Sequence, residues 1–125
     1  MLEIDPEQTR VDGPRDRISH SRLIVVEGPG RGYEFQLTDA SNRIGRGDGQ
    51  EVQLAFGDEF VSREGHATII FYGERDGFIL RDGGKANPVL VNGASVRGDQ
   101  QLRFGDIICI GETALLFSSN EPTGT

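Results

Sequence analysis

The stretch ATIIFYGERDGFILRDGG, residues 67–84, decides how this sequence folds. It contains two runs rich in β-branched and aromatic side chains, Ala67 to Tyr72 and Phe78 to Leu80, and such runs are typical of strands. Glycine and aspartate separate the two runs and follow the second one, as they do in tight turns. Two strands joined by a short turn form a hairpin, so this stretch predicts antiparallel β-structure.

The same alternation of short apolar runs and turn residues continues on both sides of the hairpin, and no segment carries a sustained helical period. Further strands are expected at residues 23–26, 33–37, 43–44, 52–54, 89–91, 101–104, 106–110 and 113–117. Many of the 18 glycines lie between them. Strands spaced by about 8 to 12 residues are typical of an antiparallel sandwich. We therefore expect an all-β sandwich of about ten to eleven short strands.

The chain of 125 residues has the length of one domain. Residues 1–21 mix charged side chains with few apolar ones and contain two prolines, so they cannot supply a core. We expect a flexible tail over residues 1–21, one folded domain over residues 22–119, and a second tail or linker over residues 120–125.

The net charge of −7 has the wrong sign for binding a polyanion, so no nucleic-acid partner is expected. The longest apolar runs, residues 23–26 and 107–110, are far shorter than the roughly 20 residues of a membrane helix, and no membrane partner is expected either. We expect a cytoplasmic protein. The single cysteine, Cys109, lies in a strand-like run, where a buried and inert thiol is the usual finding.

The residue types of an enzyme site are largely missing. The chain has two histidines, His20 and His66, and one cysteine, and it contains no nucleophile elbow and no zinc-ligand spacing. Its carboxylates are scattered over predicted turns, as on a solvated surface. We therefore expect no catalytic residue, no metal site and no cofactor.

Three short motifs lie at the ends of predicted strands. They are Gly45-Arg46, the segment Val61-Ser62-Arg63-Glu64-Gly65-His66-Ala67, and the turn Asn92-Gly93. In this order and spacing, within an all-β chain, they resemble the forkhead-associated (FHA) family, whose motifs read roughly G-R, S-x-x-H and N-G. The resemblance runs from about residue 22 to residue 119.

The resemblance implies a site for phosphothreonine peptides. Arg46 and Ser62 match the family's phosphate ligands, and Arg63 is a neighbouring contact. A phosphate brings close to two negative charges and three acceptor oxygens, which suits a guanidinium and a hydroxyl on converging loops. Asn92 matches the asparagine that grips the peptide backbone. Without the resemblance, the simpler interpretation is that Arg46 is an exposed turn arginine and that Asn92 and Gly93 form an ordinary type I′ hairpin turn.

Three further residues are implied as structural support of the site. His66 corresponds to a histidine that braces the loops through internal hydrogen bonds. Gly45 lets the backbone turn where a side chain would not fit, and Gly93 completes the Asn92 turn.

The sequence departs from the family pattern twice. Three residues separate Ser62 from His66, where the family usually has two. Either a bulge at Glu64-Gly65 absorbs the extra residue and Ser62 keeps its place, or Arg63 takes the serine's slot. The second departure is Asn87-Pro88-Val89, which stands where many members have Asn-Gly-Thr and bears on peptide selectivity.

The sequence thus predicts a non-enzymatic module that binds phosphothreonine segments and acts as an adaptor or regulator downstream of a Ser/Thr kinase. The alternative is a phosphate-independent scaffold domain with the same fold. Thr9, with Asp12 three residues later, is a possible phosphosite through which the N-terminal tail would occupy the domain's own site; a chance match in an acidic tail is the other explanation.

Overall fold

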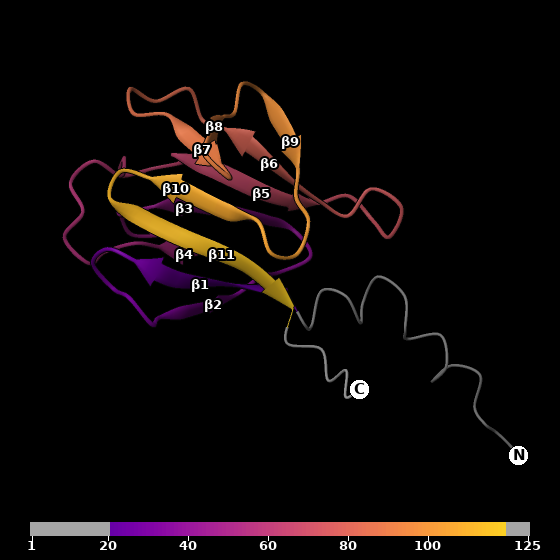
Figure 1. Ribbon diagram of the computed structural model, residues 1–125, viewed down its shortest axis with the longest axis horizontal. Helices are drawn as coiled ribbons and strands as arrows, with labels where there is room; N and C mark the ends of the chain where they lie inside the picture. The colour runs from indigo at the N-terminus through magenta and orange to yellow at the C-terminus, as the bar shows by residue number, and fades with distance from the viewer. Residues whose placement is uncertain (1–20, 120–125) are drawn as a thin grey trace, which may run out of the picture.

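The computed structural model describes residues 21–119, which form eleven strands in two sheets packed face to face (Figure 1). The strands are β1 (Ser21–Glu27), β2 (Glu34–Gln36), β3 (Ser41–Gly45), β4 (Val52–Gln53), β5 (Ala67–Phe71), β6 (Phe78–Asp82), β7 (Val89–Val91), β8 (Ala94–Ser95), β9 (Asp99–Gln101), β10 (Ile107–Ile110) and β11 (Thr113–Ser119). These residues contain no helix, and so none that is able to cross a membrane. The expected all-β sandwich is confirmed.

The two sheets differ in size. The six-stranded sheet has the order β2-β1-β11-β10-β7-β8 and lies nearer the viewer in Figure 1, whereas the five-stranded sheet has the order β4-β3-β5-β6-β9 and lies behind it. All neighbouring strands are antiparallel except β3 and β4, which run parallel. Ser21, expected in the tail, pairs with Ser119 as the first residue of β1. Thr9 and the tails at residues 1–20 and 120–125 lie outside the described residues.

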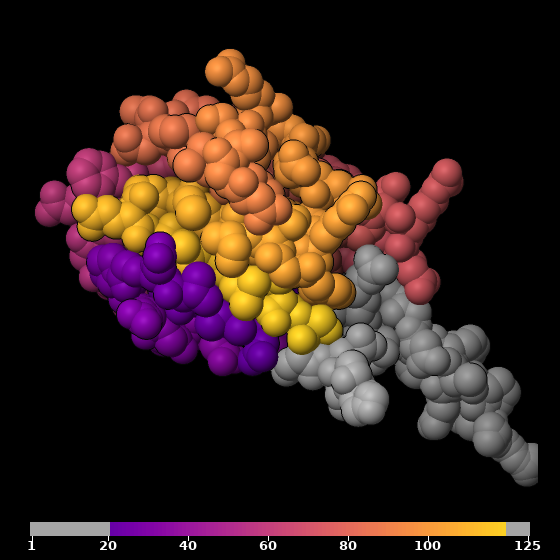
Figure 2. All heavy atoms as spheres, viewed as in Figure 1, coloured from indigo at the N-terminus to yellow at the C-terminus, as the bar shows by residue number. Residues whose placement is uncertain are grey.

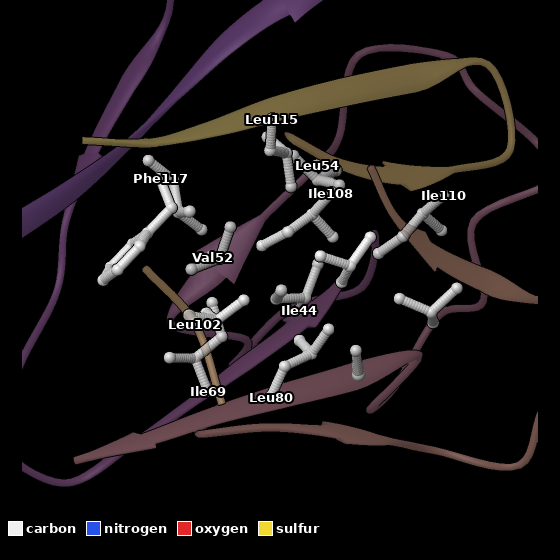
Figure 3. Packing of buried hydrophobic residues seen from close by; sticks show 14 of the residues in the cluster. Ile44, Val52, Leu54, Ile69, Leu80, Leu102, Ile108, Ile110, Leu115 and Phe117 are labelled. Atoms are coloured by element: carbon white, nitrogen blue, oxygen red, sulfur yellow. The ribbon is translucent and has the colours of Figure 1, made fainter. Parts of the chain in front are cut away.

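The core fills the space between the sheets (Figure 3). Side chains alternate along each strand, so every second residue points inward. The fully buried set includes Leu23, Ile44, Ile69, Leu80, Ile108, Ile110 and Leu115. Each such side chain contributes about 1.5–3 kcal/mol relative to exposure in solvent. The rings of Phe78 and Phe117 join the two layers edge to face, with centroids 5.4 Å apart.

Two predicted details of the strands were wrong. The strand expected at residues 101–104 is β9 at Asp99–Gln101, because the chain turns directly afterwards: the Arg103 N–H donates to the Asp106 carboxylate at 2.8 Å. Leu102 still donates its backbone N–H to the Phe78 carbonyl of β6 at 2.9 Å, whereas Phe104 packs by its side chain and stacks on Phe117 at 4.9 Å. Strand β8, with two exposed residues, has no apolar pattern and was not expected.

Candidate functional site

Three loops meet at one end of the sandwich because three strands of the five-stranded sheet end there in register. Ile44, near the end of β3, pairs with Ala67 at the start of β5, and Ala67 pairs with Asp82 at the end of β6. The β3–β4, β4–β5 and β6–β7 loops (residues 46–51, 54–66 and 83–88) therefore leave the sheet side by side. The β4–β5 and β6–β7 loops form the left-hand end of Figure 1.

Arg46 lies where the β3–β4 and β4–β5 loops touch. Its backbone N–H donates to the carbonyl of Ser62 at 3.0 Å, and its Nε–H donates to the carbonyl of Val61 at 2.7 Å. The side chain is half-buried, yet among residues 21–119 the two terminal guanidinium nitrogens have no hydrogen-bond partner. Arg22, Arg43 and Arg81 instead form ion pairs with acidic side chains. Arg46 thus presents a fixed cationic fork to an incoming anion.

Glycine is required where these loops approach each other. A Cβ on Gly45 would lie 2.5 Å from the Arg63 carbonyl oxygen, and the Gly47 N–H donates to that same oxygen at 2.8 Å. A Cβ on Gly83 would lie 1.9 Å from the Gly65 carbonyl oxygen. Any larger residue at Gly45 or Gly83 would push the loops apart.

In the segment between Ser62 and His66, Gly65 adopts a left-handed φ of +53°. The Gly65 N–H donates to Gln50 Oε1 at 2.8 Å, and the His66 N–H returns to the β3 carbonyl of Ile44 at 2.7 Å. Gly65 is thus the position in this segment where the backbone takes a conformation that favours glycine. Ser62 stays against Arg46 and is half-buried, whereas the Arg63 side chain is exposed.

His66 is fully buried and holds two of the loops together. The Ser62 N–H donates to His66 Nδ1 at 2.8 Å, and Nε2 lies 2.8 Å from the carbonyl oxygen of Asn87. Because Nδ1 accepts a hydrogen bond, the neutral ring carries its proton on Nε2 and donates it to Asn87. The imidazole is therefore enclosed between the β4–β5 and β6–β7 loops, with both nitrogens occupied.

An ion pair closes the β3–β4 loop that carries Arg46. Arg43 donates to the Glu51 carboxylate from Nε and from Nη2, each at 2.9 Å, and Nη2 also reaches the Gly49 carbonyl at 2.7 Å. These hydrogen bonds from Arg43 lower the pKa of Glu51 from 4.5 to about 2. The pair's modest contribution to stability is thus complete above pH 4.5 and is lost as the pH falls through about 2.

Asn92 and Gly93 do not lie with the other predicted site residues, and this corrects their expected placement. Strand β7 begins next to Asn87 and ends before Asn92, so Asn92 emerges at the opposite end of the strand. There Asn92 Nδ2 donates to Asp106 at 2.9 Å and Asn92 Oδ1 accepts the Ile107 N–H at 2.9 Å. Asn92 has a φ of +52° and Gly93 a φ of +87°, as in a type I′ hairpin turn. This is the turn that was the alternative to a peptide-binding role.

Sequence reasoning missed two residues at the site. Asn87 is half-buried between the loops, where its Nδ2 donates to the Phe60 carbonyl at 3.1 Å. Asp58 is buried and accepts the N–H groups of Phe60 and Glu112 and the hydroxyl of Thr113, at 3.0, 2.8 and 2.7 Å. Asn87 stood within the Asn-Pro-Val departure from the family pattern, which was a usable signal. Asp58 had no such signal, because two of its three partners, Glu112 and Thr113, lie more than fifty residues away.

The family model of the FHA domain matches residues 42–111. A search of curated proteins found no match.

Many solved structures are similar to this chain, and three of them are described here. One, from work on phosphothreonine-dependent FHA domain interactions, is 33% identical with a TM-score of 0.69, covering 81% of this chain and 97% of that one. The FhaA FHA domain, solved with the intracellular domain of Rv3910, is 32% identical with a TM-score of 0.66, covering 78% and 98%. Mycobacterium tuberculosis EmbR, solved with a low affinity phosphopeptide, is 29% identical with a TM-score of 0.65, covering 81% and 24%. Since the family model spans more than half of the sequence and these folds superimpose on the described strands, the chain belongs to the FHA-domain family.

Proposed function

We propose that this chain binds phosphothreonine-containing segments of partner proteins, with Arg46 as the main phosphate ligand. The observation that carries the proposal is the half-buried Arg46 side chain, tethered through Nε to Val61 and left with two terminal nitrogens that have no partner in the described chain. Charge-assisted, bidentate hydrogen bonds of this kind are the strongest that a protein offers a phosphate. The phosphothreonine-dependent interactions of a 33% identical FHA domain support the same assignment.

The groups around Arg46 complete a binding surface. Within residues 21–119 the Ser62 hydroxyl makes no hydrogen bond. We propose this hydroxyl as the second phosphate ligand. Arg63 and Lys85 are exposed on adjacent loops and add positive charge. Asn87, whose amide both donates and accepts, takes the role that was expected of Asn92: in this proposal it holds the peptide backbone beside the phosphate.

At the level of the cell, we propose a cytoplasmic adaptor or regulator that reads the product of a Ser/Thr kinase and uses no catalysis. FHA domains are binding modules, and the net charge of −7 disfavours nucleic acid and anionic membrane surfaces as partners. The competing function is phosphate-independent scaffolding through the same sandwich.

Titration with matched peptides separates the two functions. One peptide sequence carrying threonine, phosphothreonine or phosphoserine is added to the full chain, and binding is followed by calorimetry. We expect reversible binding of the phosphothreonine form alone, with a dissociation constant on the order of micromolar, because a short segment covers little surface. Equal binding of the phosphorylated and unphosphorylated forms would establish the scaffold.

Ser62→Ala is expected to weaken phosphopeptide binding more than Arg63→Ala does. The backbone of Ser62 is held against that of Arg46. If its hydroxyl donates to the phosphate, the loss of that hydroxyl should cost about tenfold or more in affinity, as for a hydrogen bond to a charged group. The exposed Arg63 contributes as a rim charge and should cost no more than about fivefold. Calorimetric titration of both variants checks the order; the reverse order would assign the phosphate slot to Arg63.

The N-terminal tail is a further ligand that we propose. Ser21, where β1 begins, lies beside Leu37, at the end of the sandwich opposite the Arg46 loops. If Thr9 is phosphorylated, a linker of about a dozen residues reaches at most about 40 Å when stretched. The effective concentration at the site is then below the millimolar value of a short, slack linker, and the tail competes only with weak external peptides. Installing phosphate at Thr9 should shift the backbone NMR signals of Arg46, Ser62 and Asn87. If these signals stay unchanged while an external phosphopeptide still shifts them, the phosphorylated tail does not bind the site.

A further inference from the structure

A hollow of about 270 Å³ opens at the end of the sandwich opposite the Arg46 loops. Its lining residues are Phe78, Leu102, Arg103, Phe104 and Phe117. Phe78 begins β6, whose last residue lies with the Arg46 loops. The tip of β11 and the β5–β6 turn lie at the same end as Phe78, on the right of Figure 1, and Figure 3 shows Phe117 and Leu102 at one margin of the core. The hollow therefore continues the apolar core to the surface.

Phe104 leaves an aromatic ring in solvent at the mouth of this hollow. The side chain is 47% exposed, although its ring stacks on the buried ring of Phe117. The loop that carries it is fixed, because the Gly105 N–H donates to the Phe117 carbonyl at 2.8 Å and the Phe117 N–H donates to the Asp106 carbonyl at 2.9 Å. In Figure 2 the orange atoms of the β9–β10 loop lie against the yellow end of β11. A hollow that needs no rearrangement loses less free energy on binding.

The chain that precedes the described residues joins the domain beside this hollow. Ser21 begins β1 and pairs with Ser119, two residues after Phe117. Ile18 precedes Ser21 by three residues, a span of at most about 10 Å, whereas Phe117 and Ser119 are at most about 7 Å apart along β11. The Ile18 side chain is therefore close enough along the chain to reach the hollow.

The composition of the two ends of the chain favours the N-terminal segment as the occupant. Residues 120–125 contain no leucine, isoleucine, valine, methionine or aromatic residue, whereas Ile18 is aliphatic. Asp16 lies two residues before Ile18 and supplies an anion. Its complement is Arg103 in the lining, whose guanidinium makes no ion pair or hydrogen bond among residues 21–119. Apolar surface and charge thus both match the segment just before β1.

We propose that Ile18 of the N-terminal segment docks in this hollow, against the rings of Phe104 and Phe117. Docking buries the exposed face of Phe104 and extends the folded domain beyond Ser21, and it requires no phosphate. Thr9 lies nine residues before Ile18, so a docked segment lets Thr9 move at most about 30 Å from the hollow. Docking therefore restrains the tail at the end of the sandwich opposite Arg46.

NMR of the unmodified full chain tests the contact directly. The methyl groups of isoleucine, leucine and valine are labelled, and nuclear Overhauser effects to aromatic protons are recorded. We expect such effects between the Ile18 methyl groups and the Phe104 ring, and an upfield shift of those methyl signals, because the face of an aromatic ring shields nearby protons. Absence of both would overturn the proposal.

The same spectra separate the other occupants. Nuclear Overhauser effects that join residues 120–125 to Phe104 would assign the hollow to the C-terminal segment. Effects between Ile18 and Phe104 that appear only at high protein concentration, or only between differently labelled copies, would assign it to a second chain. Either result would contradict docking of Ile18 within its own chain.

Proteolysis of matched variants measures how often the segment leaves the hollow. Trypsin cleaves after Arg17 only while that stretch is undocked, and cleavage after Arg10 is the reference within the same segment. Phe104→Ala removes one wall, whereas Phe60→Ala removes an equally exposed ring at the other end of the sandwich. We expect Phe104→Ala to raise cleavage after Arg17 several-fold relative to Arg10, and Phe60→Ala to leave that ratio unchanged.

Thermal melts by circular dichroism show whether both variants are folded at the temperature of the digestion. In folded protein, an unchanged ratio in Phe104→Ala, or the same rise in both variants, would contradict the proposal. If Phe104→Ala does not fold, the Overhauser effects of the unmodified chain decide.

Discussion

Replacing Arg46 with alanine is expected to lower phosphopeptide affinity by about 30-fold to several thousand-fold, which corresponds to roughly 2–5 kcal/mol for truncating one partner of a hydrogen-bonded charge pair. The change removes the guanidinium from a surface loop and opens no cavity in the core, but it also removes the Nε–H that donates to the Val61 carbonyl. The domain should therefore stay folded, with an unfolding midpoint lower by no more than a few degrees. Calorimetric titration with a phosphothreonine peptide and a thermal melt of the same sample measure both quantities.

Two further variants sharpen this test. Arg46→Lys keeps the charge but loses the planar fork, and it should fall between wild type and alanine. Arg75→Ala removes the same charge from the exposed β5–β6 turn, at the other end of the strands, and should leave affinity within about twofold. If a folded Arg46→Ala variant binds as tightly as wild type, Arg46 is not the phosphate ligand.

Replacing His66 with alanine is expected to lower the free energy of unfolding by about 1–3 kcal/mol. The substitution leaves the Ser62 N–H and the Asn87 carbonyl without their partner in a fully buried position. For a domain of this size the melting temperature should fall by about 4–12 °C. Denaturant unfolding followed by circular dichroism gives the free energy directly.

The role of His66 is separated from that of a ligand by measuring binding where the variant is still folded. Well below its melting temperature, a bracing histidine should leave part of the phosphopeptide affinity intact. His66→Asn can keep an acceptor facing the Ser62 N–H and should recover part of the lost stability. A variant with wild-type stability that no longer binds phosphopeptide would make His66 a ligand.

Much of the fold was predictable because strand patterns are local. Runs such as Ala67 to Phe71 and Phe78 to Leu80 alternate buried and exposed side chains, and the turn residues between them mark where the chain reverses. The pattern failed at the end of β9, which stops at Gln101 although Leu102 is buried and still donates its N–H to the Phe78 carbonyl. The apolar run does not show where the chain turns out of the sheet.

The candidate site was only partly predictable. Arg46 and Ser62 meet because Arg46 directly follows β3 and Ser62 lies in the loop that leads into β5, the neighbour of β3. Asn92 was misplaced because two asparagines flank β7, and the sequence does not show which end of that strand faces the loops. The position of β7 beside β10 decides it, since that pairing brings Asn87 to His66 and Asn92 to Asp106.

By itself, the sequence determined the all-β class, the turns and the family motif around Arg46, Ser62 and His66, because these depend on residue type and short spacing. Only the tertiary structure decided that Gly65 takes the left-handed conformation in the β4–β5 loop, and that Asn87 lies beside Phe60 whereas Asn92 lies beside Asp106. The tertiary structure also decided that Asp58 joins two distant loops. These features depend on strand pairing across long stretches of chain, and a local pattern carries no information about which distant residues become neighbours.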